Sequence, residues 1–307
     1  DPWWNIPSHP KALFDHITFS SNVNGSRLIK IAGNNNTWRY DDLYGTDWAI
    51  FIEDSTFTWT GGATGDISDT EYGVRLVVRH NTITNGDIQV HDTGGTQGAR
   101  GQRVTEIYGN TISCNAANCA NLSAMGLRGG GYLVYNNTIT GNFFSPAWPQ
   151  IWRTDVGAGF LGGMCNGNPV RACNTPNYYH CSGGDHAQCS YPGDYACNGK
   201  GTCVVACTSN SDCPVGTDGT ATCLATVDKV DGGSNAYGWP CRDQTGRGKE
   251  YGIGGALQEI SPVYWYNNAD GVNSVTFSNN YPNYFQQNRD FCYHDPSTSC
   301  GTKAGWT

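Results

Sequence analysis

The chain has 307 residues, of which only 14% are charged, and its net charge is −8. That length allows one large domain or two ordinary ones with a substantial core. The acidic balance argues against nucleic acid and anionic membrane as partners, and no apolar run reaches the roughly 18 residues that a membrane span needs. Glycine is abundant, with 41 residues, which suits short β-strands joined by tight turns.

Five segments in the first half of the chain repeat one seven-residue pattern. They read FDHITFS, IEDSTFT, VRHNTIT, IYGNTIS and VYNNTIT. The first position is apolar, the fifth is Thr, and the last is Ser or Thr. The sixth position is always Phe or Ile, at Phe19, Phe57, Ile83, Ile112 and Ile139. No apolar stripe with a helical period of 3.6 residues accompanies the repeat, so the pattern favours strands.

Stacked coils of short strands account for this repeat. Each strand can then pair with the equivalent strand of the next coil, and like residues stack on like. Three asparagines align in the repeat, at Asn81, Asn110 and Asn137. We expect them at a sharp turn, where asparagine tolerates unusual backbone angles and where their side-chain amides can form a ladder.

The repeated N-T-I/F segment resembles the right-handed parallel β-helix proteins of the pectate-lyase-like superfamily, over roughly residues 12–145. The resemblance implies an all-β fold, a right-handed parallel β-helix (solenoid). We expect a long disulfide-rich loop insertion in addition. That fold hosts lyases, hydrolases, phage tailspikes, adhesins and structural proteins, so it does not select one activity. The calcium and arginine motifs typical of pectate lyases are not recognisable in this sequence.

Residues 152–252 interrupt the repeat and contain ten of the fourteen cysteines. The segment CVVACTSNSDCPVGTDGTATC resembles small secreted cysteine-rich repeats, which rely on cross-links because they lack apolar residues for a core. A zinc site would need closely spaced pairs such as C-x2-C, and none occurs. We therefore expect disulfides, with all fourteen cysteines paired and no metal in the insertion.

Two disulfides are expected outside the insertion, Cys114 with Cys119 and Cys292 with Cys300, each closing a local loop. An even number of cysteines indicates an oxidising compartment. The chain begins with DPWWNIPSHP, and we interpret it as a mature secreted chain whose targeting segment has been removed. The expected localisation is secreted or extracellular.

The β pattern resumes after the insertion. YNNA in the last part of the chain aligns with YNNT of the fifth repeat. The expected organisation is therefore β-helix coils over residues 1–151, the cysteine-rich insertion over 152–252, and a return to the β-helix with a disulfide-closed tail over 253–307.

Candidate catalytic residues lie on the outward face beside the apolar positions. Arg75, Arg79, His91 and Glu106 could line a groove in which arginines neutralise a uronate carboxylate while a histidine or arginine abstracts a proton. A hydrolase would instead need two facing carboxylates, such as Glu53 and Glu106. The alternative is that Glu53 and Arg79 form an ordinary cross-coil ion pair worth well under about 1 kcal/mol.

Aromatic residues are a second signal. Tyr108 and Tyr135 share the outward column of Arg79, and Trp148 and Trp152 lie in the segment WPQIWR. Their flat faces suit sugar rings, so we mark them as candidate carbohydrate-binding residues. The alternative is that the loop aromatics pack against the side of the solenoid.

No cofactor or metal is predicted. Asp66, Asp69, Asp87 or Asp92 could hold Ca²⁺ through carboxylate oxygens, but no calcium-binding motif marks them.

Two classes of function follow. The first is a secreted protein that binds, and as an enzyme would cleave, an extracellular polysaccharide, acting then as a polysaccharide lyase or glycoside hydrolase. The second is a structural subunit of an extracellular filament or surface layer, built by end-to-end stacking of copies, because an uncovered β-helix end exposes unpaired strands. No nucleic acid and no membrane span are expected in either case.

Overall fold

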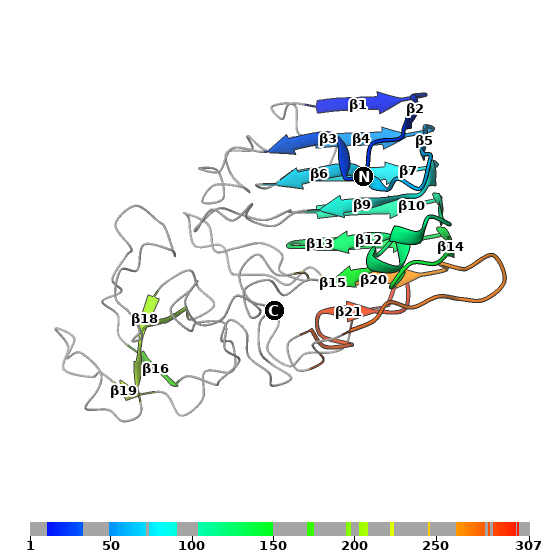
Figure 1. Ribbon diagram of the computed structural model, residues 1–307. Helices are drawn as coiled ribbons and strands as arrows, with labels where there is room; N and C mark the ends of the chain where they lie inside the picture. The colour runs from blue at the N-terminus through cyan, green and yellow to red at the C-terminus, as the bar shows by residue number, and fades with distance from the viewer. Residues whose placement is uncertain are drawn as a thin grey trace.

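The computed structural model describes residues 11–32, 49–71, 74–90, 104–149, 262–279 and 285–298, together with the short pieces 171–174, 195–197, 203–207, 222–223, 245, 282 and 300. The chain winds through three parallel sheets in turn, and successive coils stack on one another (Figure 1). This arrangement is a parallel β-helix, as the repeat predicts.

Each of the first five coils contributes one strand to each sheet in turn, whereas β20 and β21 after the insertion belong to sheet I alone. Sheet I contains β1 (Lys11–Asp15), β4 (Ala49–Glu53), β7 (Arg75–Arg79), β10 (Val104–Tyr108), β13 (Gly131–Tyr135), β20 (Val263–Tyr266) and β21 (Phe291–Cys292). Sheet II contains β2 (Thr18–Ser21), β5 (Thr56–Trp59), β8 (Thr82–Thr84), β11 (Thr111–Cys114) and β14 (Thr138–Gly141). Sheet III contains β3 (Ser26–Ala32), β6 (Gly65–Glu71), β9 (Gly86–Val90), β12 (Met125–Leu127) and β15 (Trp148–Pro149).

The core is built from aligned apolar columns. The sixth position of every repeat pairs with its counterpart on the next coil, which confirms the predicted column Phe19, Phe57, Ile83, Ile112 and Ile139. The first position forms a second column in sheet I, with Ile52, Val78, Ile107 and Val134 fully buried. Stacking of like side chains fills the interior evenly and removes the apolar residues from water.

A ladder of asparagines runs along the corner between sheets I and II. The Nδ2 of Asn81 donates to the Oδ1 of Asn110 (3.0 Å), Asn110 donates to Asn137 (2.9 Å), and Asn137 donates to Asn268 (2.8 Å). Each Nδ2 also donates to a backbone carbonyl of the preceding coil, as Asn110 does to Val78 (2.9 Å). The ladder is therefore confirmed, and Asn268 extends it beyond the insertion.

The prediction that the ladder asparagines themselves take the unusual backbone angles is wrong. The residue just before each ladder position does so, with positive φ at His16, Asp54, His80, Gly109, Asn136 and Asn267. A left-handed residue turns the chain at the corner, and the next residue can then point its amide inward. This corner position tolerates Gly, Asn, Asp and His, so it leaves no single-residue signature in the sequence.

Sheet III departs from the regular repeat. Asp66 pairs with Asp87, but the register between β6 and β9 shifts before Asp69 pairs with Gln89, which marks a β-bulge. Next to the bulge, the Trp59 ring packs closely against Gly86, where an added Cβ would lie only 2.4 Å from the ring. Bulges of this kind redirect side chains and occur beside functional sites.

The β-helix resumes after the insertion, as YNNA predicts, because β20 pairs in parallel with β13 and places Tyr266 against Tyr135. Within the insertion, β16 (Arg171–Asn174), β17 (Tyr195–Cys197), β18 (Cys203–Cys207) and β19 (Thr222–Cys223) form a small antiparallel sheet. The predicted disulfides of this insertion stay a prediction, because the side chains of its cysteines lie outside the part of the structure that is described. In the part of the chain that is described, no helix is long and apolar enough to cross a membrane.

Candidate functional site

The outward face of sheet I carries the predicted column around Arg79. The register places Asp15, Glu53, Arg79, Tyr108 and Tyr135 on successive coils, in the predicted order. Arg79 forms an ion pair with Glu53, and its Nη1 donates to the hydroxyl of Tyr108 at 2.8 Å. The guanidinium is thus held between neighbouring coils by a carboxylate on one side and a hydroxyl on the other, which is the arrangement expected of a cross-coil ion pair.

The tyrosines of this column stack on one another. The rings of Tyr108 and Tyr135 are 4.7 Å apart and inclined by 9°, and those of Tyr135 and Tyr266 are 5.1 Å apart and inclined by 2°. Burial between its neighbours raises the pKa of Tyr135 to about 12. Because each ring face covers the next ring, the ladder presents edges and hydroxyls to the solvent. Its inner members cannot offer the flat face on which a sugar ring would lie.

The other predicted catalytic residues are placed as follows. Glu106 lies between Val77 and Leu133 on the neighbouring coils, and burial raises the pKa of this carboxyl while the charge of Arg79 opposes the rise. Arg75 is buried at the start of β7, at the opposite end of the strand from Arg79. His91 and the predicted carbohydrate-binding Trp152 lie outside the described residues, and so does Asp92.

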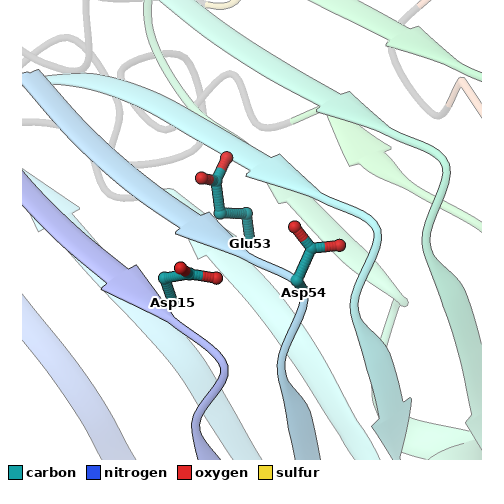
Figure 2. Close-up of side chains that lie close together, drawn as sticks. All are labelled: Asp15, Glu53 and Asp54. Atoms are coloured by element: carbon teal, nitrogen blue, oxygen red, sulfur yellow. The ribbon is translucent and has the colours of Figure 1, made fainter.

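A group of three carboxylates lies at the N-terminal end of this column, where Asp15, Glu53 and Asp54 approach within 4.8 Å of one another (Figure 2). Each has a basic neighbour. Asp15 contacts His16, Glu53 contacts Arg79, and Asp54 lies 3.7 Å from Nδ1 of His80. Arg79 therefore already neutralises Glu53, the middle member of this group.

Sheet III forms a more enclosed site. A cavity of about 220 Å³ opens on this sheet, and its lining includes Arg27 from β3, Asp66 from β6, Asp87 and Gln89 from β9, and Trp148 from β15. Trp148 is one of the predicted carbohydrate-binding residues, and 37% of its surface is exposed. The cavity therefore combines an accessible indole with carboxyl, amide and guanidinium groups.

Charged residues of β3 and β6 are linked beside this cavity. The Nε of Arg27 donates to Asp66 (3.0 Å) and its Nη1 to the buried Asp69 (2.8 Å), while the Nζ of Lys30 lies 3.4 Å from Asp69. These contacts give two of the three described calcium candidates a basic partner. The third, Asp87, has none among these contacts and lies at the cavity floor.

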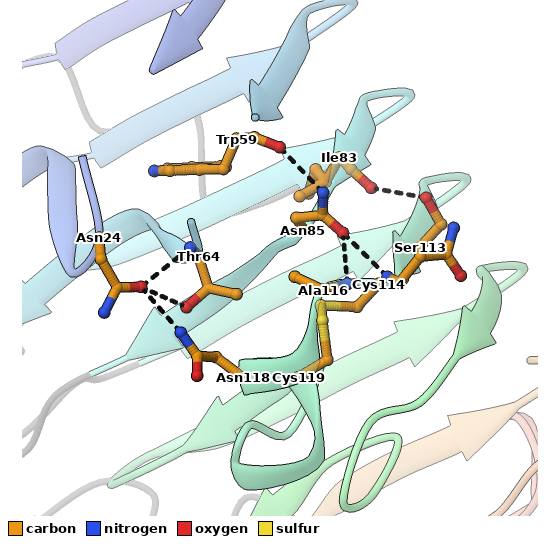
Figure 3. Close-up of a disulfide and its surroundings, with 11 residues drawn as sticks. Asn24, Trp59, Thr64, Ile83, Asn85, Ser113, Cys114, Ala116, Asn118 and Cys119 are labelled. Atoms are coloured by element: carbon orange, nitrogen blue, oxygen red, sulfur yellow. Dashed lines mark hydrogen bonds between the residues drawn. A yellow bond between two sulfur atoms is a disulfide. The ribbon is translucent and has the colours of Figure 1, made fainter. Parts of the chain in front are cut away.

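A loop that includes the 3₁₀ helix η3 (Ala117–Asn121) forms another part of the cavity wall. A disulfide and asparagine side chains hold this loop in place (Figure 3). The predicted disulfide Cys114–Cys119 is present and closes this loop. The Oδ1 of Asn85 accepts from the backbone N–H groups of Asn115 (2.8 Å) and Ala116 (3.2 Å). The second predicted disulfide, Cys292–Cys300, is also present.

The loop brings Asn121, Leu122 and Ser123 to the cavity, and Arg128 follows β12. Sequence reasoning missed these residues, together with Arg27 and Gln89. The asparagine-rich turn after Cys114 was a signal for a fixed loop, but nothing in its spacing indicates which sheet the loop covers.

Comparison with known proteins finds no matching family model, no matching curated protein and no matching solved structure.

Proposed function

We propose that this chain is a secreted β-helix protein, related to the pectate-lyase-like superfamily, that binds an extracellular polysaccharide in the cavity of sheet III. The fold supports the proposal in general terms, because β-helices present long, rigid surfaces to polymers. The two disulfides are compatible with an oxidising, extracellular environment.

The observation that carries the proposal is the position of Trp148. Its half-exposed indole lies at a cavity whose other groups are mostly polar, namely Arg27, Asp66, Gln89 and Asn121. A sugar ring has apolar C–H faces and a rim of hydroxyls, so it needs one flat apolar surface and several hydrogen-bonding groups around it.

The size of the cavity limits what it can hold. At about 220 Å³ it is smaller than the roughly 300–1,000 Å³ of pockets that enclose drug-sized ligands. It suits one sugar unit, and the rest of a polymer would lie along the outer surface of the solenoid. The face around Arg79 is a second candidate contact, where tyrosine hydroxyls and Glu106 would meet the chain through hydrogen bonds.

The test is binding of soluble polysaccharides, both neutral and acidic, by affinity electrophoresis and calorimetry with the Trp148→Ala variant. We expect binding to fall at least about tenfold, equivalent to about 1.4 kcal/mol, with little change in the melting temperature. Phe144→Ala is the matched control, because Phe144 is 58% exposed and does not line the cavity. Wild-type binding by Trp148→Ala would refute the cavity as the site.

The Arg79→Ala variant in the same assay tests the face of sheet I. Loss of binding with unchanged melting would assign the polymer to that face, as the sequence predicts for Arg75, Arg79, His91 and Glu106. Unchanged binding with a slight loss of stability would leave Arg79 as an ion-pair residue.

One observation favours the structural alternative. Within the described part of the chain, the end strands β1, β2 and β3 each pair with a strand on one side only. Such edges template the addition of further strands. Negative-stain images at increasing concentration decide the question, since filaments would support end-to-end stacking of copies and single particles throughout would exclude it.

A further inference from the structure

Two carboxyl groups meet at the floor of the sheet III cavity. Asp66 and Asp87 occupy paired positions on neighbouring coils, and Gly65 pairs with Gly86 just before them. Directly opposed residues on adjacent strands are about 4.8 Å apart along the hydrogen-bonding direction, and two like charges there repel. Both side chains line the same cavity, and a hydrogen bond between the two carboxyls is among the causes that raise the pKa of Asp87.

The environment of Asp87 favours its protonated form. Its side chain is fully buried, and its Oδ2 accepts a hydrogen bond from the Nε2 of Gln89 (2.6 Å). The buried Oδ1 accepts a hydrogen bond from no N–H or hydroxyl group among the described residues. A buried carboxylate with an unmatched oxygen is costly, whereas a carboxylic acid can donate to a neighbouring carboxylate. Burial, and then the charge of Asp66, raise the pKa of Asp87 well above its ordinary value.

Asp66 is the accessible member of the pair. Its side chain is 18% exposed, lines the cavity and accepts from the Nε of Arg27. The charged groups packed around the pair are Arg27 and Lys30 from β3, Asp69 from β6, and Arg128 after β12. Arg27 donates to Asp66, and its positive charge favours a negative charge on that carboxyl. We therefore assign the charge of the pair to Asp66 and the proton to Asp87.

We propose that Asp66 and Asp87 hold one proton between them, and that this proton fixes Asp66 and Arg27 in the arrangement that binds an uncharged, hydroxyl-rich sugar unit. The inference rests on the proposed function, and it names the ligand class and assigns Asp87 as a positioning residue. Arg27 already contacts two carboxylates, and Asp66 repels a sugar carboxylate. Hydroxyl groups, which both donate and accept, match the acceptor oxygens of Asp66 and the donors of Arg27.

The closeness of the two carboxyls also restricts the chemistry of the pair. Glycoside hydrolysis by two carboxyls needs a separation of about 5–5.5 Å for retention, or about 6.5–9.5 Å for inversion. Carboxyls that share a proton are closer than either value. The pair therefore orients a ligand instead of flanking a glycosidic bond.

The proton makes binding depend on pH. As pH rises through the raised pKa of Asp87, the acid ionises and two adjacent negative charges face each other. Asp66 then moves away from the buried charge, its geometry with Arg27 is lost, and affinity for the sugar falls. Binding is therefore strongest on the acidic side of this titration.

The first experiment follows the aspartate carboxyl carbons of the unliganded protein by NMR between about pH 4 and pH 9. We expect one aspartate to titrate far above the others, and that signal to disappear in Asp87→Asn. Asp66→Asn should lower the titration of the Asp87 carboxyl, because it removes the facing charge. If no aspartate titrates late, the shared proton is refuted whatever the protein binds.

The second experiment measures binding over the same pH range with a neutral β-glucan, a galactomannan and a xylan, and with polygalacturonate. Wild-type affinity for a neutral polymer should fall at least about tenfold as the late carboxyl ionises. Asp87→Asn keeps a neutral donor beside Asp66, so its affinity should stay constant over that range. Asp270→Asn, which changes an exposed aspartate outside the cavity, is the control and should behave as wild type.

The outcomes separate the two proposals. A pH dependence that persists in Asp87→Asn refutes the role of the proton. Preferential binding of polygalacturonate that is lost in Trp148→Ala keeps the proposed function and refutes the neutral ligand class. Binding of none of the polymers at any pH refutes the proposed function, and the NMR titration still decides whether the proton is shared.

Discussion

Replacing one asparagine of the ladder should destabilise the whole solenoid. Asn110 is 1% exposed, and its Oδ1 accepts from both the backbone N–H and the Nδ2 of Asn81, each at 3.0 Å. Its Nδ2 donates to the carbonyl of Val78 and to the Oδ1 of Asn137, each at 2.9 Å. The Nδ2 also donates to the carbonyl of Tyr108 (3.1 Å), and in Asn110→Ala all five contacts disappear.

The size of the effect follows from these contacts. The backbone N–H of Asn81 loses its acceptor in the core, which costs about 1–3 kcal/mol, and each of the other lost bonds contributes about 0.5–1.5 kcal/mol. We therefore expect the free energy of unfolding to fall by at least about 3 kcal/mol, a large part of the roughly 5–15 kcal/mol that stabilises a typical domain.

The assay is equilibrium unfolding in urea with the disulfides intact, followed by far-UV circular dichroism. Thr111→Ala is the control, because Thr111 is the exposed neighbour on the same coil and should change the free energy by less than about 0.5 kcal/mol. Asn110→Asp adds a pH test. The new carboxylate can accept from Asn81 but cannot donate, so stability should recover as the pH falls and the carboxyl is protonated. A loss below about 1 kcal/mol in Asn110→Ala would refute the ladder as a stabilising element.

Three further changes test other parts of the structure. Gly86→Ala places a Cβ 2.4 Å from the Trp59 ring and should cost about 1–3 kcal/mol, seen as a lower melting temperature; an unchanged melting temperature would contradict the close packing. Replacing Cys114 and Cys119 together by Ser should cost on the order of 2 kcal/mol for so short a loop and should weaken polysaccharide binding, because the loop forms one wall of the cavity; calorimetry that shows neither loss would contradict this. Asp87→Asn should remove a pH dependence of stability. Because the folded state raises the pKa of Asp87, its contribution is complete at low pH and is lost as the pH rises through the raised pKa, so the wild type should lose stability relative to the variant over that range.

The repeating part of the fold could be predicted from sequence because each position recurs. The aligned Phe and Ile residues, the Asn ladder and the outward column of Arg79 all lie where the repeat places them. Recurrence averages out the ambiguity of any one segment, since a wrong register would expose a whole column of apolar residues. The left-handed residue at the corner could not be predicted, because His, Asp, Gly and Asn all occur at that position.

The cavity could not be predicted because it lies on sheet III, outside the seven-residue segment that repeats in sheets I and II. Sheet III has no shared motif, and its register shifts at the bulge between Asp66 and Asp69. Arg27, Gln89 and Trp148 come from separate coils, and the loop after Cys114 closes the site from outside. Such an assembly depends on how unlike coils stack, and no spacing within a single segment encodes it.

A regular outward face is a poor place for a ligand site, and the two surfaces of this protein show why. On the inner strands of sheet I each side chain has a neighbour one coil away on either side, so Arg79 contacts Glu53 and Tyr108, and the rings of Tyr108 and Tyr135 stack. A ligand must then compete with contacts that already satisfy the face. At the bulge of sheet III the stacking is offset, and the indole of Trp148 keeps 37% of its surface exposed beside the cavity. The break in the repeat therefore leaves an uncovered aromatic face, and a sugar can bind to it without displacing an internal contact.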